Sequence, residues 1–423
     1  MRVDSSQYEA VKHSLSHRVA LIQGPPGTGK TFIGSLIVKL LLLNKPKDSS
    51  PILMICYKNQ ALDRFIEICV HECNLDINDI YRIGSNSKNP NSEKFKFVYT
   101  DELEVIEKST DLSFQVYACN SYSRRLYEGS ESLVKIQQTY DDYQRLREEN
   151  IANKLKTAKV LAMTSSYASI YKKILQKVNA KIILFEEAAE IFESHIVSLL
   201  TSKTKHIIQI GDHIQLSPKP NSIKLAKICK LNVSMFERLI KNGISHVSLK
   251  YQHRMHPFIS SLINNFYNHE LVNMTENSLE KIKGMKQSVF FIDHDKHEDI
   301  HEGTSKSNKF EVLYATRLCN YLLQQGYSEY DITILSMYYS QVKKIRKQLQ
   351  DIKRANVKVF TVDSFQGQEN KIIILSCVRS NKSGLIGFTG LSNRVCVALS
   401  RAKSGFYCIG NFQVSYINIV DFV

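Results

Sequence analysis

The residues with the clearest chemical meaning form a glycine-rich loop between a short apolar run at 19–22 and a helical stretch at 32–43. Glycines let the backbone curl so that successive N–H groups point at phosphate oxygens, and the start of the following helix favours negative charge. In such a loop the lysine reaches the β- and γ-phosphates and the last hydroxyl coordinates Mg²⁺. The pattern predicts a nucleoside triphosphate and Mg²⁺ held by Gly24, Pro25, Pro26, Gly27, Thr28, Gly29, Lys30 and Thr31.

Two adjacent carboxylates, Glu186 and Glu187, end a later apolar run at 182–185. Hydrolysis of a nucleoside triphosphate requires one carboxylate to hold Mg²⁺ and one to orient or deprotonate the attacking water. We assign the first role to Glu186 and the second to Glu187. A pair of glutamates by itself is usually a solvated loop. Its place at a strand end, downstream of a phosphate loop, favours the catalytic assignment.

Three further side chains suit phosphoryl transfer. Gln215 follows the run at 206–210 and offers both a donor and an acceptor to a γ-phosphate or to the attacking water. Arg254 and Arg401 carry planar guanidinium groups, which stabilise the negative charge that spreads over the equatorial oxygens. Taken alone, the glutamine segment could be an ordinary turn, and each arginine could be a surface charge.

Short apolar runs that alternate with helical stretches predict an α/β fold with parallel sheets. The first series of strands is expected at 19–22, 52–57, 81–83, 160–164, 182–185 and 206–210, and the second at 289–292, 332–335, 357–362, 372–377 and 406–409. We therefore predict two tandem domains, 1–246 and 247–423. The rhythm is lost at about 86–156, a polar stretch that we interpret as an insertion projecting from the first sheet; a flexible surface excursion is the alternative.

The chain has 423 residues and a net charge of +15. That balance indicates a polyanionic partner, although a generally basic surface would also account for it. The nine cysteines are scattered, so we expect a reducing compartment. Cys69 and Cys73 lack a second pair at zinc-ligand spacing and are expected to pack on a helix. The apolar run at 36–43 is too short to span a bilayer, so no membrane segment is expected.

The motifs taken together resemble superfamily 1 helicases, and more narrowly the up-frameshift branch of RNA helicases. The resemblance rests on the phosphate loop, the segments at 186–189, 211–218 and 252–255, and the segments at 362–369 and 397–402, which occur in the family's order. The tail at 386–403 is most similar to that of helicases with NFX-type zinc fingers. The match covers nearly the whole chain except about 86–156.

The resemblance implies two RecA-like P-loop NTPase domains, with ATP in the cleft between the lobes and single-stranded RNA across both. It implies that Gln7 recognises adenine, that Glu369 contacts the ribose side of the nucleotide, and that Gly367 lies near the γ-phosphate. It also implies that Asn59, Thr164, Ser165 and Thr361 touch the nucleic-acid backbone, a contact that carries no sequence information. Such residues are equally often caps or turns. By the same resemblance, movement is 5′-to-3′ and the pathway is RNA surveillance, silencing or antiviral defence.

The sequence departs from the family at two residues of these motifs. Glu186 stands where an aspartate is usual, and His253 stands where relatives have a tyrosine thought to stack on the base. We also expect this chain to be the motor core of a larger protein, cytoplasmic and associated with RNA granules by resemblance, with unknown protein partners. Three alternatives to the RNA motor stay open: an ATP-gated RNA clamp with little unwinding, a DNA helicase of the same branch, and a pseudoenzyme scaffold.

Overall fold

The computed structural model describes residues 3–46, 49–84, 97–98, 132–274, 281–299 and 305–414. It divides into two compact units. The first comprises Met1–Gln23, Lys30–Gly211 and Pro218–Val247; the second comprises Gly24–Gly29, Asp212–Ser217 and Ser248–Val423. Two short segments that carry predicted site residues, the phosphate loop and the turn after Gly211, thus group with the second unit.

The first unit is built on one sheet with the strand order β4-β3-β5-β2-β6-β7-β1-β8. Adjacent strands from β4 to β1 pair in parallel, as the predicted α/β fold requires. The strands are β1 (Val19–Gln23), β2 (Ile52–Cys56), β3 (Ile80–Ile83), β4 (Phe97–Val98), β5 (Val160–Thr164), β6 (Ile182–Glu186), β7 (His206–Gly211) and β8 (His246–Ser248). All six strands predicted for this half are present, and β4 and β8 are additional.

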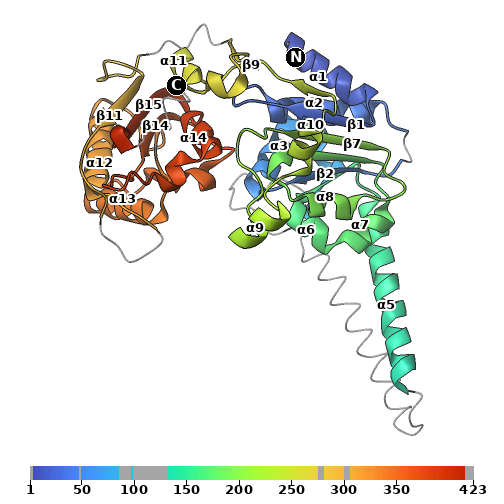
Figure 1. Ribbon diagram of the computed structural model, residues 1–423. Coiled ribbons are helices and arrows are strands. Elements are labelled where there is room, and N and C mark those ends of the chain that lie inside the picture. The colour runs from blue at the N-terminus through green and yellow to red at the C-terminus, as the bar shows by residue number, and fades with distance from the viewer. Residues whose placement is uncertain are drawn as a thin grey trace. The chain divides into compact units, whose positions relative to one another are not determined.

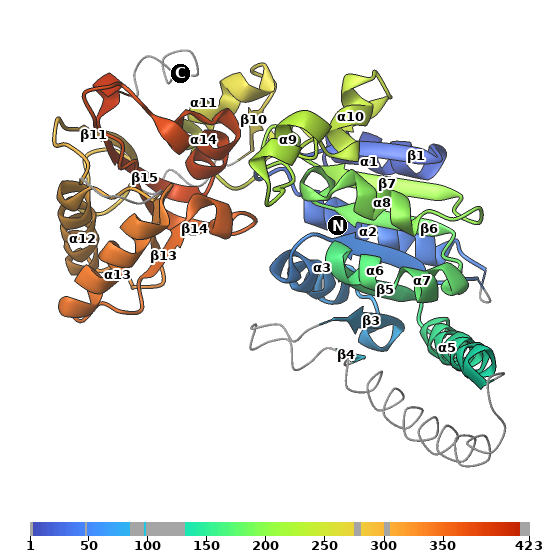
Figure 2. The same cartoon turned by 60° about the horizontal axis from the view of Figure 1, so that its bottom comes forward.

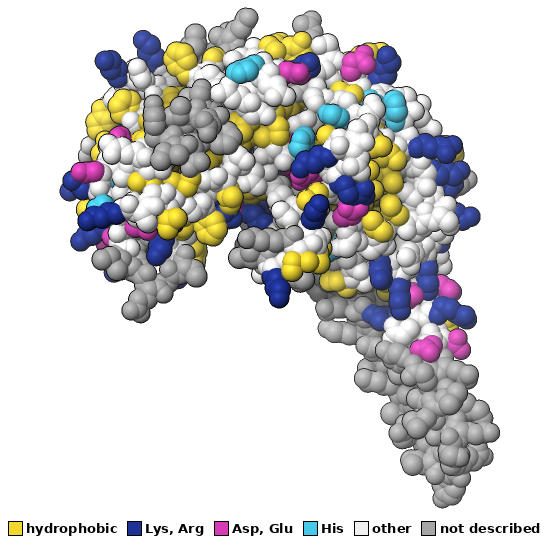
Figure 3. All heavy atoms as spheres, viewed as in Figure 1, with side chains coloured by type: hydrophobic (Ala, Val, Ile, Leu, Met, Phe, Trp, Pro, Cys, Tyr) yellow, Lys and Arg dark blue, Asp and Glu magenta, His cyan; other side chains and the backbone are white. Residues whose placement is uncertain are grey.

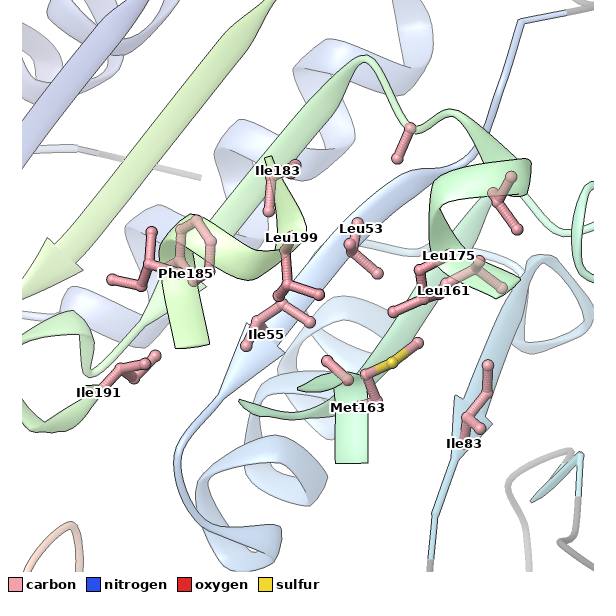
Figure 4. Close-up of a cluster of buried hydrophobic side chains, with 14 of the residues drawn as sticks. Leu53, Ile55, Ile83, Leu161, Met163, Leu175, Ile183, Phe185, Ile191 and Leu199 are labelled. Atoms are coloured by element: carbon pink, nitrogen blue, oxygen red, sulfur yellow. The ribbon is translucent and has the colours of Figure 1, made fainter. Parts of the chain in front are cut away.

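Helices cover both faces of this sheet (Figures 1 and 2). One layer contains α1 (Ser5–Ser16), α2 (Lys30–Leu43) and α3 (Asn59–His71), which contact one another in sequence order. The other contains α6 (Ser165–Ile170), α7 (Lys172–Val178) and α8 (Glu193–Leu199), with α9 (Ile223–Cys229) and α10 (Met235–Lys241) following along the chain. Alternate residues of the central strands, such as Leu53 and Ile55, pack with the second layer in the cluster of Figure 4.

The expected insertion at about 86–156 lies largely outside the described residues, apart from β4 and the long helix α5 (Ser132–Leu155). Among the described side chains of α5, Ile151, Ala152 and Leu155 in its last turns join the core. The start of α5 points away from the sheet (Figure 1). Figure 3 shows side chains of both charge signs on its described part, which suits a solvated helix.

The second unit has a five-stranded parallel sheet in the order β11-β15-β14-β12-β13. Its strands are β11 (Val289–Asp293), β12 (Ile332–Ser336), β13 (Lys358–Thr361), β14 (Asn370–Ser376) and β15 (Ala402–Gly410). Buried side chains of α12 (Lys309–Gln324) and α13 (Tyr339–Asp351) belong to one core cluster. Those of α11 (Pro257–Asn264) and α14 (Ser392–Leu399) belong to another. A small sheet of β9 (Tyr251–Gln252) and β10 (Val272–Asn273) precedes this one.

Two helix boundaries differ from those that the sequence pattern predicts. The pattern predicts a helix over 392–403, but α14 ends at Leu399 and β15 begins at Ala402, so Arg401 lies in the turn between them. Residues 405–410 of β15 are all buried in the sheet, and this burial overrides a longer helix. The pattern also predicts a first helix over 8–15, but α1 begins at Ser5, because Asp4 caps it. Among the helices of the described residues, none is long and apolar enough to cross a membrane.

Candidate nucleotide and nucleic-acid site

The predicted chemical groups of the first unit follow neighbouring strands at one edge of its sheet. In the parallel register, Gln23 of β1 pairs with Gly211 of β7, and Glu186 of β6 pairs with Ile210 of β7 and with Cys56 of β2. The segments that follow these strands therefore start side by side. Ligands bind outside the carboxyl ends of the strands in open α/β sheets, and the predicted nucleotide residues begin at this edge.

The phosphate loop has the backbone conformation that its glycines were expected to permit. Gly27 and Gly29 have φ angles of +78° and +86°, a region that other residues rarely adopt. Thr28 closes the loop, because its hydroxyl donates to the carbonyl oxygen of Pro25 at 2.8 Å. Helix α2 begins at Lys30, so its first N–H groups have no partner within the helix and are suited to bind an anion.

A hydroxyl and a carboxylate meet where a metal ion was predicted. The Thr31 hydroxyl donates to Oε1 of Glu186 at 2.9 Å, and Oε2 of Glu186 is buried without a hydrogen-bond partner. Burial, reinforced by Glu187, raises the pKa of Glu186 to about 8, with Lys30 and Thr31 acting in the opposite direction. A buried carboxylate with an unmet oxygen is stabilised by a cation, so these residues fit Mg²⁺ despite the longer side chain of Glu186.

Magnesium at such a site takes one or two protein oxygens and completes its shell with water and phosphate. It therefore needs no cluster of three or more acidic, histidine or cysteine ligands, and the described residues contain none. Glu186 and Thr31 alone can supply the protein's share.

The proposed catalytic base, Glu187, has an uncommon backbone conformation. Its φ and ψ angles are 53° and 43°, in the left-handed region, directly after β6. The turn is tight, because a Cβ added to Gly211 would lie 2.9 Å from the backbone nitrogen of Ala189. Small residues at 188 and 189 and a glycine at 211 thus permit the close approach. Strain of this kind is found at functional sites, where the surrounding structure holds it.

A buried hydrogen-bond chain in the second unit includes two of the predicted catalytic residues. Nη2 of Arg401 donates to Oε1 of Gln215 at 3.1 Å, and Nε2 of Gln215 donates to Asp212 at 2.6 Å. The hydroxyl of Tyr267 donates to the same carboxylate oxygen of Asp212 at 2.6 Å. Asp212 therefore fixes which end of the Gln215 amide faces the arginine. Neither Asp212 nor Tyr267 was predicted, and only the Gly-Asp-x-x-Gln spacing hinted at the first.

Arg401 differs from the surface charge that a lone arginine usually is. It is 2% exposed, and its guanidinium also donates to the carbonyl oxygens of Val397 and Gln368. In the described structure Arg401 therefore acts first as a connector within the second unit. Its proposed action on a phosphate would use the same guanidinium.

Arg254 forms an ion pair with Glu369, which also pairs with Lys403 at 3.1 Å. The backbone nitrogen of His253 donates to the carbonyl oxygen of Gly27 at 2.9 Å. A Cβ added to Gly27 would lie 2.8 Å from Cβ of Arg254, so the phosphate loop and the 252–255 motif approach closely. Gly367 has a φ of +78°, and a Cβ added there would meet no atom within 4 Å. The backbone conformation, not close packing, therefore favours glycine at this position.

Gln7, the proposed adenine contact, has a local role that sequence reasoning missed. Its side-chain oxygen accepts from the backbone nitrogen of Asp4 at 3.2 Å, while the Asp4 carboxylate accepts from the Gln7 nitrogen. This capping box fixes the start of α1. The signal was present in the sequence as an Asp followed three residues later by a Gln.

The proposed nucleic-acid contacts lie at carboxyl ends of strands, but they are not equally accessible. Asn59, Thr164 and Thr361 are half-buried, and the latter two cap the short helices that follow them. Ser165 is fully buried, and its hydroxyl has no hydrogen-bond partner. Of the 164–165 pair, only the threonine is open to a strand in this structure.

Behind Asn59 lies a buried ion pair that the sequence did not reveal. Nε of Arg82 donates to Asp63 at 3.1 Å, and Nη2 of Arg82 donates to Oδ1 of Asn59 at 2.9 Å. Arg82 and Asp63 are each 1% exposed. A second pair joins Lys58 to the buried Glu190 at 2.9 Å. An arginine in a strand and an aspartate one helical turn after Asn59 gave too weak a pattern to predict the first.

The chain is similar in sequence to several known proteins. Two family models, each described as an AAA domain, match residues 2–125 and 231–413. "NFX1-type zinc finger-containing protein 1" of Homo sapiens is 44% identical over 296 residues, which are 70% of this chain and 15% of that protein.

Two relatives from Schizosaccharomyces pombe align with almost the whole chain. "ATP-dependent helicase upf1" is 30% identical over 98% of this chain and 45% of its own length. "Helicase required for RNAi-mediated heterochromatin assembly 1" is 25% identical over 97% of this chain and 57% of its own length. The chain thus spans between about a seventh and somewhat more than half of these relatives.

Proposed function

We propose that this chain, which belongs to the superfamily 1 helicases of the up-frameshift and NFX1-type zinc finger group, is an ATP-driven motor that binds single-stranded RNA. The observation that carries the proposal is the contact between Thr31 of the phosphate loop and Glu186 of the acidic pair. It joins the two motifs that triphosphate hydrolysis requires, at the carboxyl edge of one sheet. The net charge of +15 supports a polyanionic partner.

The proposed roles follow from the chemistry of each side chain. The N–H groups at the start of α2 and the ammonium of Lys30 bind the phosphates, and Glu187 orients the attacking water and accepts its proton. Gln215 contacts the terminal phosphate, and Arg254 and Arg401 neutralise the charge that develops on it. Thr31 and Glu186 would hold Mg²⁺, which supplies Lewis-acid stabilisation of that charge.

Further features of the proposal come from the family resemblance of the motifs. Gln7, His253, Gly367 and Glu369 complete the nucleotide contacts, and Asn59, Thr164 and Thr361 contact the strand, whereas the buried Ser165 does not reach it. The motor would move 5′-to-3′ in RNA surveillance, silencing or antiviral defence, in the cytoplasm, with RNA granules as one location. Its two domains would divide at 246–247.

An ATP-gated RNA clamp is the second candidate, and Glu186 favours it. The glutamate is one methylene longer than the usual aspartate, and a displaced metal would slow turnover. Stopped-flow translocation on end-labelled strands of increasing length separates the two functions: a motor gives a lag that grows with length, and a clamp gives none. A DNA motor of the same branch is tested with matched RNA and DNA strands, because only RNA presents a 2′-hydroxyl.

The catalytic assignment is tested by Glu187→Gln. The variant should bind ATP as tightly as the parent and hydrolyse it at least about 100-fold more slowly, because a general base contributes about 10²–10⁴-fold. Glu193→Gln, which loses only a partly exposed ion pair with Arg238, is the matched control. Hydrolysis at the parent rate by Glu187→Gln would overturn the assignment.

A further inference from the structure

An exposed aromatic side chain of the second unit lies in a turn that is fixed by a buried tyrosine. Phe388 lies in the short 3₁₀ turn Gly387–Gly390 and is 47% exposed. Its backbone nitrogen donates to the hydroxyl of Tyr338 at 3.1 Å, and Tyr338 itself is buried. Gly387 has a φ of +56°, and a Cβ there would lie 2.6 Å from the Tyr338 hydroxyl. The turn therefore lies directly on Tyr338, with no room for a larger residue at 387.

The ring of Phe388 has a cationic support. The guanidinium carbon of Arg394 lies 4.5 Å from the ring centroid, over one face. Arg394 is fixed in turn by two hydrogen bonds to the carboxylate of Asp363, at 3.0 and 2.9 Å. This forked pairing holds the guanidinium plane in place. The ring is thus positioned before any ligand binds, so binding does not carry the entropy cost of ordering this side chain.

This ring lies near a residue already proposed to contact the strand. Asp363 belongs to the turn Val362–Phe365, which Thr361 caps at the carboxyl end of β13. Tyr338 follows the carboxyl end of β12, the neighbour of β13 in the sheet. Phe388 therefore occupies the edge of the second sheet where ligands of open α/β folds bind.

We propose that Phe388, supported by Arg394, is a stacking platform for one base of a single-stranded nucleic acid. The inference rests on the proposed function and adds a base contact to a set that otherwise reaches only the backbone. Every nucleobase has a flat π face, so the platform accepts any sequence, as a motor requires. The nearby guanidinium and the basic chain favour a polyanion over an apolar protein segment, although Leu385 and Leu391 are also exposed nearby in sequence.

The chain contains no tryptophan, so Phe388→Trp introduces a single fluorescent reporter at the platform. Single-stranded RNA should quench that fluorescence, because a base stacked on an indole quenches it, and a strand of abasic sites with the same phosphates should not. Tyr330→Trp is the matched control. Tyr330 is 69% exposed and precedes β12, at the opposite edge of the same sheet, so RNA should leave its fluorescence unchanged.

Binding of labelled RNA is measured in parallel by anisotropy. Phe388→Ala should raise the Kd about 5-fold to 150-fold, from about 1–3 kcal/mol for one stacked base, and Phe388→Tyr should restore it. An unmodified chain that fails to bind any strand would remove both the proposed function and this inference. Tight RNA binding with unquenched Phe388→Trp, or with an unchanged Kd for Phe388→Ala, would overturn the platform alone and leave the motor intact. In that case the exposed ring would serve a protein partner.

Discussion

Replacing Arg82 with methionine separates a structural role from a positioning role at the proposed strand contact. Arg82 and Asp63 are both almost fully buried, and their ion pair measures 3.1 Å. Methionine fills the space but leaves the Asp63 charge buried and unpaired, which costs about 3–5 kcal/mol of unfolding free energy. Arg82 also fixes the side-chain oxygen of Asn59, so the variant should lose this orientation as well.

The double variant Asp63→Leu/Arg82→Met makes the distinction. Replacing both members of a buried ion pair by apolar residues is often neutral or stabilising, so its unfolding free energy should return to within about 1 kcal/mol of the parent. The Asn59 amide remains unrestrained in it. RNA affinity should therefore stay reduced by about 5-fold, the loss of roughly one hydrogen bond of about 1 kcal/mol.

Chemical denaturation followed by circular dichroism and anisotropy with labelled RNA give the two readouts. Lys159→Met is the matched control, because it removes an ion pair with Asp79 that lies at the surface of the same unit and should change stability little. If Arg82→Met costs no more than this control, the buried pair does not have the energetic role given to it. If the double variant regains full RNA affinity, Arg82 does not position Asn59.

Two further predictions concern buried groups beside the site. Burial raises the pKa of Glu190 from 4.5 to about 7, against the opposing charge of Lys58. Because its pKa is higher in the folded chain, the stability that Glu190 contributes is complete below about pH 4.5 and is lost as the pH rises through 7. Glu190→Gln should flatten this fall of about 3 kcal/mol in the free energy of unfolding, measured by chemical denaturation at several pH values, and an unchanged slope would contradict it. Tyr267→Phe removes the hydrogen bond to Asp212 and should lower strand-stimulated kcat about 10-fold, the effect of losing about 1.4 kcal/mol, with ATP affinity unchanged. Tyr321→Phe, which loses an exposed hydrogen bond to Gly284, should change neither, and equal kinetics for both variants would refute the positioning of Gln215.

Much of the scaffold could be predicted because its signals are local. Short apolar runs bounded by turns marked eleven strands, and glycine spacing marked the phosphate loop with its positive φ angles at Gly27 and Gly29. The family resemblance was confirmed by the relatives. The edge of each sheet that carries polar side chains could be predicted, because the apolar runs end at polar residues.

Contacts between distant residues could not be predicted in this way. Tyr267 meets Asp212 across 55 positions, and Arg82 meets Asp63 across 19, with no periodic pattern to join them. The burial of Arg401 depends on the turn that ends α14, where helix propensity alone predicted a longer helix. Ser165 has the residue type of a strand contact but is fully buried, because it opens α6 against the core. Residue types indicate the chemistry, whereas accessibility depends on the packed fold.

The measurement that tests the central claim most directly is steady-state ATP hydrolysis by the purified chain without nucleic acid, with single-stranded RNA and with the matched DNA strand. An RNA-stimulated motor predicts slow hydrolysis alone, strong stimulation by RNA and weaker stimulation by DNA, all abolished in Glu187→Gln. Raising the salt concentration should weaken strand binding steeply, because bound phosphates release counterions. Absence of hydrolysis under every condition, with ATP still bound, would contradict the motor and favour the clamp.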